Sequence, residues 1–296
     1  ANMEAQWPLV FFTLFTALAA GVFGLVCLSE FLGKAPRTQL PGSIIALVSL
    51  VIGGIFSALH LGHLERVFNV LNNLSSGISQ ELILVVLLGA AIVAYMLLLR
   101  AGKPALRKTV AAAGIALSLV SALFLGNSYY LASRPAWNTW LMPILYLVSA
   151  AVLGLFVMYI LVTTTRTDDG SVTRLNRAAI ITLIVHGAVI LAYVVFLAVA
   201  PHAAAERSPS RLLSGDLAWV FWGGIVLLGL AIPLLLTVGY RAGRKGITAS
   251  IVAIVGFVGV LIIVRPGTDA FHPAMLLSLL GEALSWHERY LETGRM

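Results

Sequence analysis

"WPLVFFTLFTALAAGVFGLVCLSEFL", from Trp7 to Leu32, contains a single charged residue, Glu30. An α-helix needs about 20 predominantly apolar residues to cross the hydrocarbon core of a bilayer, so this stretch is long enough to span a membrane. The whole chain of 296 residues has the same character, because 60% of its residues are hydrophobic and only 10% are charged. A soluble domain carries about 25% charged residues, so this composition predicts a polytopic membrane protein.

Seven more stretches have comparable length and hydrophobicity, and none shows the alternation expected of a β-barrel strand. The predicted spans are Trp7–Leu32, Pro41–Leu61, Glu81–Leu99, Thr109–Leu131, Trp140–Val162, Ala178–Ala200, Leu217–Val238 and Ile247–Val264. We therefore expect an all-α fold, a bundle of eight transmembrane helices that forms one integral membrane domain over residues 1–296. Residues 266–296 repeat apolar side chains at helical spacing, which predicts an amphipathic C-terminal tail rather than a ninth span.

The basic residues indicate how the bundle is oriented. Most of the 19 lysines and arginines lie in the loops after the first, third, fifth and seventh spans. Cytoplasmic loops carry such an excess, so both termini are expected on the outer, periplasmic side of the inner (cytoplasmic) membrane. Topology therefore accounts for the net charge of +7 without a nucleic-acid partner. The single cysteine, Cys27, cannot form an internal disulfide or hold an iron–sulfur cluster alone.

A polar segment, "SALHLGHLERVFNVLNNLSSGISQELI" (Ser57–Ile83), joins the second and third spans on the expected outer face. Its apolar residues repeat at helical spacing, which predicts a short amphipathic interfacial helix. Ser79 is expected to cap the third span, with Glu81 in its first turn. Two interpretations fit: an ordinary interfacial connection, or a pocket for a quinol, whose tail needs hydrocarbon and whose ring oxygens need hydrogen-bond partners. In the second, His60 accepts a proton and a carboxylate relays it outward.

Several motifs together resemble the DmsC family of membrane-anchor subunits. They are "QWPLVFFT" in the first span, "HLGHLERVFNVLNN" after the second, a glutamate opening the third, and "YYLASRPAWNTW" between the fourth and fifth. That family serves dimethyl sulfoxide reductase and related molybdopterin oxidoreductases. The resemblance covers the eight-helix layout and is clearest over residues 6–140.

The resemblance implies an anchor that carries out anaerobic respiratory electron transport and is not catalytic alone. It would oxidise menaquinol at the periplasmic face without haem. The electrons would pass to a four-cluster ferredoxin-like iron–sulfur subunit and then to a molybdopterin catalytic subunit, both docked on that face. Iron–sulfur clusters and molybdopterin would belong to these partners only, and no metal site is expected in this chain.

The resemblance also assigns site residues. The family's quinol-site histidine falls on His60 and its associated glutamate on Glu81, which are the expected catalytic pair. Arg66 and Asn69 match its motif and are expected to bind the quinol. The family's glycine–glutamate pair before an arginine in the last span is missing before Arg265, and a Gly281–Glu282 pair lies in the tail instead.

The residues themselves suggest further members of the site. Tyr129 or Tyr130 can hydrogen-bond a quinone oxygen, and Trp137 either lines the pocket mouth or anchors the chain at the membrane interface. His63, which replaces a residue that is usually small in the family, and Glu65 are candidates for a proton relay.

Other functions fit the pattern less well. His60 and His186 differ in depth by roughly 15 Å at about 1.5 Å per helical residue, so they are poorly placed as a pair of haem ligands. His186 is expected to hydrogen-bond between helices or to line a polar cavity. A secondary transporter usually carries carboxylates near the midplane, whereas Glu30 and Glu81 lie near span ends. A purely structural anchor without quinol chemistry remains an alternative.

Overall fold

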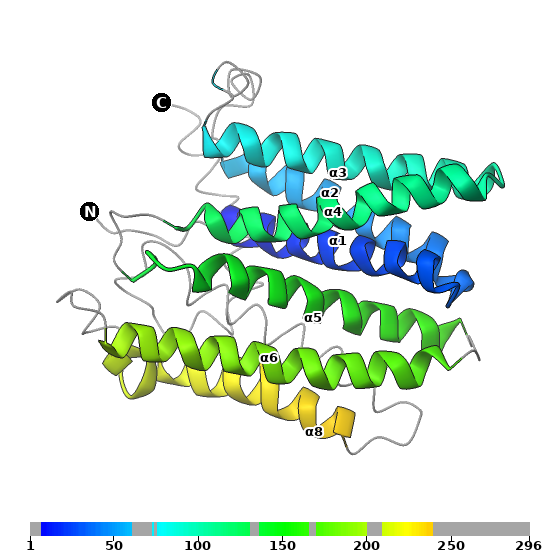
Figure 1. Ribbon diagram of the computed structural model, residues 1–296. Helices are drawn as coiled ribbons and strands as arrows, with labels where there is room; N and C mark the ends of the chain where they lie inside the picture. Colours follow the sequence, from blue (N-terminus) through cyan, green and yellow to red (C-terminus); the bar gives the residue numbers. More distant parts are fainter. Residues whose placement is uncertain are drawn as a thin grey trace.

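The computed structural model describes residues 7–60, 73, 76–130, 136–165, 170–199 and 209–238, and within these ranges the regular structure is entirely helical (Figure 1). The elements are α1 (Trp7–Leu32), η1 (Pro36–Thr38), α2 (Gln39–His60), α3 (Gly77–Arg100), α4 (Pro104–Asn127), α5 (Leu141–Thr164), α6 (Ser171–Val199), η3 (Val220–Ala231) and α8 (Ile232–Val238). The expected all-α architecture is confirmed for this part of the chain.

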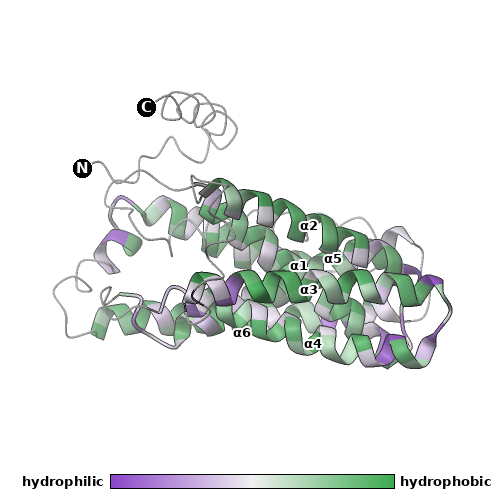
Figure 2. Ribbon diagram, turned by 90° about the horizontal axis from the view of Figure 1, so that it is seen from above, coloured by the Kyte–Doolittle hydropathy of each residue, from purple (hydrophilic) through white to green (hydrophobic). Residues whose placement is uncertain are grey.

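Seven helical stretches among the described residues are long and apolar enough to cross a membrane, the last of them formed by η3 and α8. They correspond to the first seven predicted spans. The predicted eighth span, Ile247–Val264, and the tail 266–296 lie outside the described residues. Figure 2 shows apolar residues along the lengths of the helices and hydrophilic residues gathered towards their ends. Large apolar side chains also face outward, such as Leu97 and Leu191 at 61% and 65% exposure, as expected for a surface in contact with lipid.

Glycine and proline fix the helix ends at one side of the bundle. Helix α1 ends where Gly33 adopts a left-handed φ of 60°, and α3 ends before Gly102 with a φ of 64°. The backbone N–H of Lys34 donates to the carbonyl of Ser29 at 3.1 Å, which satisfies one of the last carbonyls of α1. Helix α4 then begins with Pro104, whose missing N–H costs nothing at a first helical position.

The start of α3 corrects one prediction. Ser76, not Ser79, is the N-cap: its hydroxyl accepts a hydrogen bond from the backbone N–H of Ser79 at 3.2 Å. The Ser79 hydroxyl instead donates to the carbonyl of Asn73 at 2.7 Å. Both serines suit the capping rule, and the helix takes the earlier one, so Glu81 lies in the second turn rather than the first.

Helix α1 lies at the centre of the described bundle and packs against α2, α4 and α5, while α6 covers the far side of α5 and carries η3 and α8 (Figure 1). The contact between α1 and α5 is made backbone to backbone. A Cβ atom on Gly21 would collide with the carbonyl oxygen of Ala150, and one on Gly154 would collide with the backbone of Gly21. Such small residues allow membrane helices to approach closely, which is how transmembrane packing is stabilised.

The helices alternate in direction, so the bundle has two distinct ends. At the end that contains Glu81, called here the Glu81 end, α2, α4 and α6 finish and α3 and α5 begin. The opposite end contains Glu30 and is called the Glu30 end. The basic loops predict that the Glu81 end is the outer one.

A buried polar network ties four helices together at the Glu30 end. Glu30, only 5% exposed, forms an ion pair with Arg107 of α4 at 2.7 Å. Its other carboxylate oxygen accepts hydrogen bonds from Tyr95 of α3 at 3.0 Å and from Gln39 of α2 at 2.9 Å. Because this carboxylate is fully paired, the network locks α1 to α2, α3 and α4.

Candidate functional site

The candidate site lies at the Glu81 end, where α3, α4 and α5 meet. Glu81 is half-buried on α3, and Ser128 just beyond α4 lies beside its carboxyl group, with the Ser128 hydroxyl donating to the Phe124 carbonyl at 3.1 Å. The turn after α4 is built by backbone bonds from Tyr129 N–H to the Gly126 carbonyl at 3.1 Å and from Tyr130 N–H to the Asn127 carbonyl at 2.9 Å. This turn places Ser128 beside Glu81 of α3 and Tyr129 beside Tyr146 of α5.

A close approach between α4 and α5 holds that turn in place. A Cβ atom on Gly126 would lie 2.5 Å from the Cα atom of Pro143, a distance that side chains do not tolerate. Glycine at this position therefore allows the end of α4 to touch the start of α5. As a result, Tyr129 faces Tyr146, one turn further along α5.

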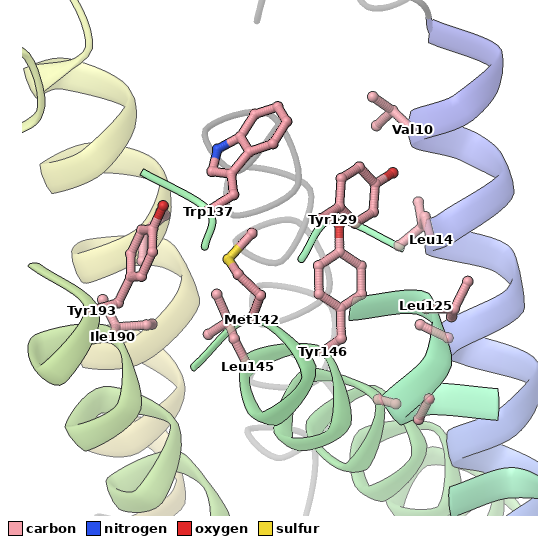
Figure 3. Close-up of a cluster of buried hydrophobic side chains, with 14 of the residues drawn as sticks. Val10, Leu14, Leu125, Tyr129, Trp137, Met142, Leu145, Tyr146, Ile190 and Tyr193 are labelled. Carbon is pink, nitrogen blue, oxygen red and sulfur yellow. The ribbon is translucent and has the colours of Figure 1, made fainter. Parts of the chain in front are cut away.

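Four buried aromatic residues surround this junction, and we call them the aromatic cluster: Tyr129, Trp137, Tyr146 and Tyr193 (Figure 3). The rings of Tyr129 and Tyr146 are stacked with centroids 5.5 Å apart. Trp137 meets Tyr129 edge-on, with centroids 6.1 Å apart. The Tyr193 hydroxyl of α6 donates to the Ala136 carbonyl at 3.1 Å, which fixes the backbone that carries Trp137.

The cluster lies near Glu81. The Tyr146 hydroxyl is a hydrogen-bond partner of Tyr129 and lies in the neighbourhood of the Glu81 carboxyl group. The surrounding wall is apolar, with Val10 and Leu14 of α1 and Met142 of α5 packed against the rings (Figure 3). The site therefore combines one carboxyl group, several hydroxyl groups and flat aromatic faces near one end of the bundle, where the helices meet the membrane surface.

The structure brings three of the predicted site residues together, namely Glu81, Tyr129 and Trp137. Trp137 is only 8% exposed, so it is not an anchor in the membrane interface, whereas the nearby Trp140 is 68% exposed and suits that role. Tyr130 lies against Trp140, with ring centroids 5.3 Å apart, and is not part of the aromatic cluster.

The remaining predicted residues fall where the structure gives no side-chain description. His60 is the last residue of α2, at the Glu81 end, and its side chain lies outside the described part of the chain. The same holds for the whole segment that contains His63, Glu65, Arg66 and Asn69. Phe56, one turn before His60, packs against the hydrophobic cluster that contains the aromatic residues, so α2 reaches the site.

Tyr146, Tyr193 and Ser128 were not predicted from the sequence. Tyr146 and Tyr193 each lie inside an apolar run near its expected outer end, and a hydroxyl-bearing ring at that depth is the signal that points to them. His186 was expected either to hydrogen-bond between helices or to line a polar cavity, and the first expectation is confirmed. Its Nε2 atom lies 3.1 Å from the Ser149 hydroxyl, a hydrogen bond between α6 and α5.

Within the described residues, no three histidine, cysteine, aspartate or glutamate side chains gather as a metal site would require. Among the described residues of the candidate site, the polar groups are the Glu81 carboxyl group and the hydroxyl groups of Ser128 and the tyrosines. Such a set suits hydrogen bonding to a neutral organic molecule and exchange of protons with it.

A comparison with known families agrees with this geometry. A family model described as "Polysulphide reductase, NrfD" matches residues 2–268, and the chain belongs to that family. Its members are membrane subunits of quinone-linked reductase complexes and typically work with iron–sulfur and molybdoenzyme subunits. The match confirms the expected class of membrane anchor without singling out the DmsC family. No curated protein matches the chain.

Proposed function

We propose that this chain is the menaquinol-oxidising anchor subunit of a respiratory molybdopterin oxidoreductase related to the DmsC type. The observation that carries the proposal is the position of Glu81 beside Ser128 and the buried tyrosines, near one end of the bundle. The bundle belongs to a family of quinone-linked membrane subunits. The described residues suit the two parts of a quinol head group, its flat ring and its two ring oxygens. Aromatic faces pack against a flat ring, and hydroxyl and carboxyl groups hydrogen-bond its two oxygens.

The residues of this chain handle protons rather than electrons. Bound menaquinol supplies two electrons and two protons. His60 accepts one proton on an imidazole nitrogen, and Glu81 accepts the second on its carboxylate. Arg66, Asn69 and Tyr129 hold the ring, while Trp137 covers the opening of the site. His63 and Glu65 then pass the protons to the aqueous phase at the Glu81 end.

The two electrons leave through a partner, because this chain is expected to hold no redox centre of its own. An iron–sulfur subunit docked at the Glu81 end receives them and passes them to the molybdopterin subunit, which selects the terminal substrate. With the Glu81 end outside, protons are released on the side to which the electrons depart, so this step alone builds no proton gradient.

The secondary transporter is the weaker alternative. Ion-coupled transport needs a buried carboxylate that gains and loses its ion, yet Glu30 is held by Arg107, Tyr95 and Gln39. A purely structural anchor is distinguished from the proposal by experiment rather than by geometry.

The experiment uses the purified complex with all its subunits and the variant His60→Ala. We expect oxidation of a soluble menaquinol analogue to fall by about 100-fold or more, the usual scale for loss of a general base. Binding of a fluorescent quinol-site inhibitor should weaken in the same variant. Reduction of the terminal substrate with an artificial soluble donor should stay unchanged, because that route bypasses the anchor.

His186→Gln is the matched control, since it changes a buried histidine outside the candidate site and keeps a hydrogen-bonding group opposite Ser149. It should oxidise the quinol analogue like the wild type. Unchanged quinol oxidation in His60→Ala would sink the assignment and leave the structural anchor in its place.

A further inference from the structure

A groove at the Glu30 end has two chemically different parts. It is a cavity of about 150 Å³ between α1, α5 and α6. Apolar side chains, among them Leu25, Leu28 and Met158, form most of its wall. Lys34 and Arg174 line the same cavity beyond the ends of these apolar stretches, where α1 has finished and α6 begins.

The groove has an apolar neighbour further along α1. A second cavity of about 170 Å³ lies between α1, α4 and α5 and shares Leu25 and Leu28 with the first. Its wall is made almost entirely of small and aliphatic residues, and it reaches Ala20 on α1. The distance from Ala20 to the end of α1 at Leu32 is roughly 18 Å at about 1.5 Å per residue. One leaflet of hydrocarbon is about 15 Å thick, so the two cavities together match the length of one acyl chain.

The charged part of the groove favours an anion. Lys34 and Arg174 place two positive charges at the membrane-surface end of the cavity, and Ser171, the first residue of the 29-residue helix α6, also lines it. The first backbone N–H groups of a helix lack partners within the helix and add a partial positive charge. Basic pockets between transmembrane helices on the cytoplasmic side are suited to anionic lipid headgroups.

We propose that this groove binds one anionic phospholipid, with its phosphate at Lys34 and Arg174 and one acyl chain along α1 beside Leu25 and Leu28. The ligand must be amphipathic, because the cavity at the Glu30 end is cationic at its membrane-surface end and otherwise mostly apolar, and the adjoining cavity is apolar. The site is separate from the quinol site, which lies at the Glu81 end, and does not depend on the proposed quinol chemistry.

The test uses the purified full-length chain in its complex, reconstituted in nanodiscs that contain equal parts of phosphatidylglycerol and phosphatidylcholine. Lipids retained after transfer to detergent are counted by native mass spectrometry. We expect the wild type to retain phosphatidylglycerol in preference to phosphatidylcholine. The double variant Lys34→Gln/Arg174→Gln should lower that retention by roughly tenfold or more, given about 1 kcal/mol per basic residue near the membrane surface and about 1.4 kcal/mol per tenfold.

Two matched variants separate this site from general effects of charge and folding. Arg100→Gln/Lys103→Gln removes two cations from the same end of the bundle that do not line the groove, and it should retain the lipid as the wild type does. Ala178→Leu fills the groove wall without changing charge and should also lower retention. Both groove variants should unfold like the wild type in denaturant titrations in detergent, which shows that they have folded.

Four results would overturn the proposal. Equal retention of the two lipids would show that the headgroup is not recognised, and equal loss in the Arg100/Lys103 control would show a surface-charge effect. Displacement of the retained lipid by added inorganic phosphate would point to a site for free phosphate. Absence of retained lipid in the wild type would show that protein covers the groove.

Discussion

Glu30 and Glu81 are two glutamates set in apolar helices at opposite ends of one bundle, and they have very different neighbours. Glu30 is ion-paired with Arg107 and hydrogen-bonded by Tyr95 and Gln39. The ion pairs among the described residues are Glu30–Arg107 and Arg211–Asp216, so no described cation neutralises Glu81. Its described neighbours are the Ser128 hydroxyl and the tyrosines of the aromatic cluster.

The difference between the two glutamates shows that the neighbouring side chains, rather than the residue type, decide what a carboxyl group does in a membrane bundle. A charge in a low-dielectric interior costs several kcal/mol unless it is paired, so the Glu30 network must stay intact for the helices to hold together. A hydroxyl group is both a donor and an acceptor and can hydrogen-bond a carboxyl group in either protonation state. Under the proposed function Glu81 exchanges a proton, whereas the paired Glu30 stabilises the packing of the helices.

The largest expected effect comes from breaking the Glu30 network. Arg107→Met leaves Glu30 without its cation, and we expect a loss of about 3–5 kcal/mol in the free energy of unfolding, measured by denaturant titration in detergent. The double variant Glu30→Gln/Arg107→Met should recover most of that loss, because no unpaired charge remains. Arg100→Met serves as control, since Arg100 is exposed at the same end of the bundle. A loss in the double variant as large as in Arg107→Met would argue that packing, and not the charge pair, stabilises this end.

Glu81→Gln should give the opposite pattern. We expect quinol oxidation by the complex to fall about 100-fold, since the side chain can no longer accept a proton, while the free energy of unfolding changes by less than about 1 kcal/mol. Glu30→Gln is the comparison variant: it should lower stability and leave quinol oxidation by the folded protein unchanged. If Glu81→Gln oxidised quinol at the wild-type rate, the proton-accepting role would have to move elsewhere.

The sequence predicted the helices well because a membrane span is a local property. Length and hydrophobicity define each apolar run, and α1 has the predicted bounds, Trp7–Leu32. The start of α3 was predicted one turn late, because Ser76 and Ser79 both satisfy the capping rule and their environment decides between them.

The candidate site was predicted only in part because it is assembled from distant segments. Glu81, Tyr129 and Trp137 were found through motifs and local chemistry. Tyr146 and Tyr193 were missed because hydropathy does not reveal which face of a span meets which neighbour. Their role depends on the close approach of Gly126 to Pro143 and on the bond from Tyr193 to Ala136, contacts that a single sequence does not encode in any local pattern.

Tyrosine hydroxyls offer a smaller test at both ends of the bundle. Tyr146→Phe removes a hydroxyl from the aromatic cluster, and we expect KM for the quinol analogue to rise about fivefold, the equivalent of one hydrogen bond worth about 1 kcal/mol. Tyr95→Phe removes the hydroxyl bonded to Glu30 and should lower stability by about 1 kcal/mol with no change in KM. Similar changes in KM for both variants would mean that the hydroxyls act through the packing of the whole bundle.

The smallest effect is expected at a third carboxylate, Asp216, which repeats the pairing of Glu30 in a solvent-exposed setting. Arg211 contacts Asp216 at 2.7 Å, as Arg107 contacts Glu30, but the Asp216 side chain is 41% exposed. Hydrogen bonds from the Arg211 side chain lower the pKa of Asp216 below its ordinary value of 3.8. The stability that this pairing contributes is therefore present above that ordinary value and is lost as the pH falls through the lowered folded-state pKa.

Because water screens an exposed pair, Asp216→Asn should change the free energy of unfolding by no more than about 0.5 kcal/mol at pH 7. The difference from the wild type should shrink below about pH 4, where the carboxyl group of the unfolded chain becomes protonated. Denaturant titrations at several pH values measure both quantities. An effect at pH 7 as large as that of Arg107→Met would mean that the ion pair itself, and not its burial, determines how strongly these carboxylates stabilise the bundle.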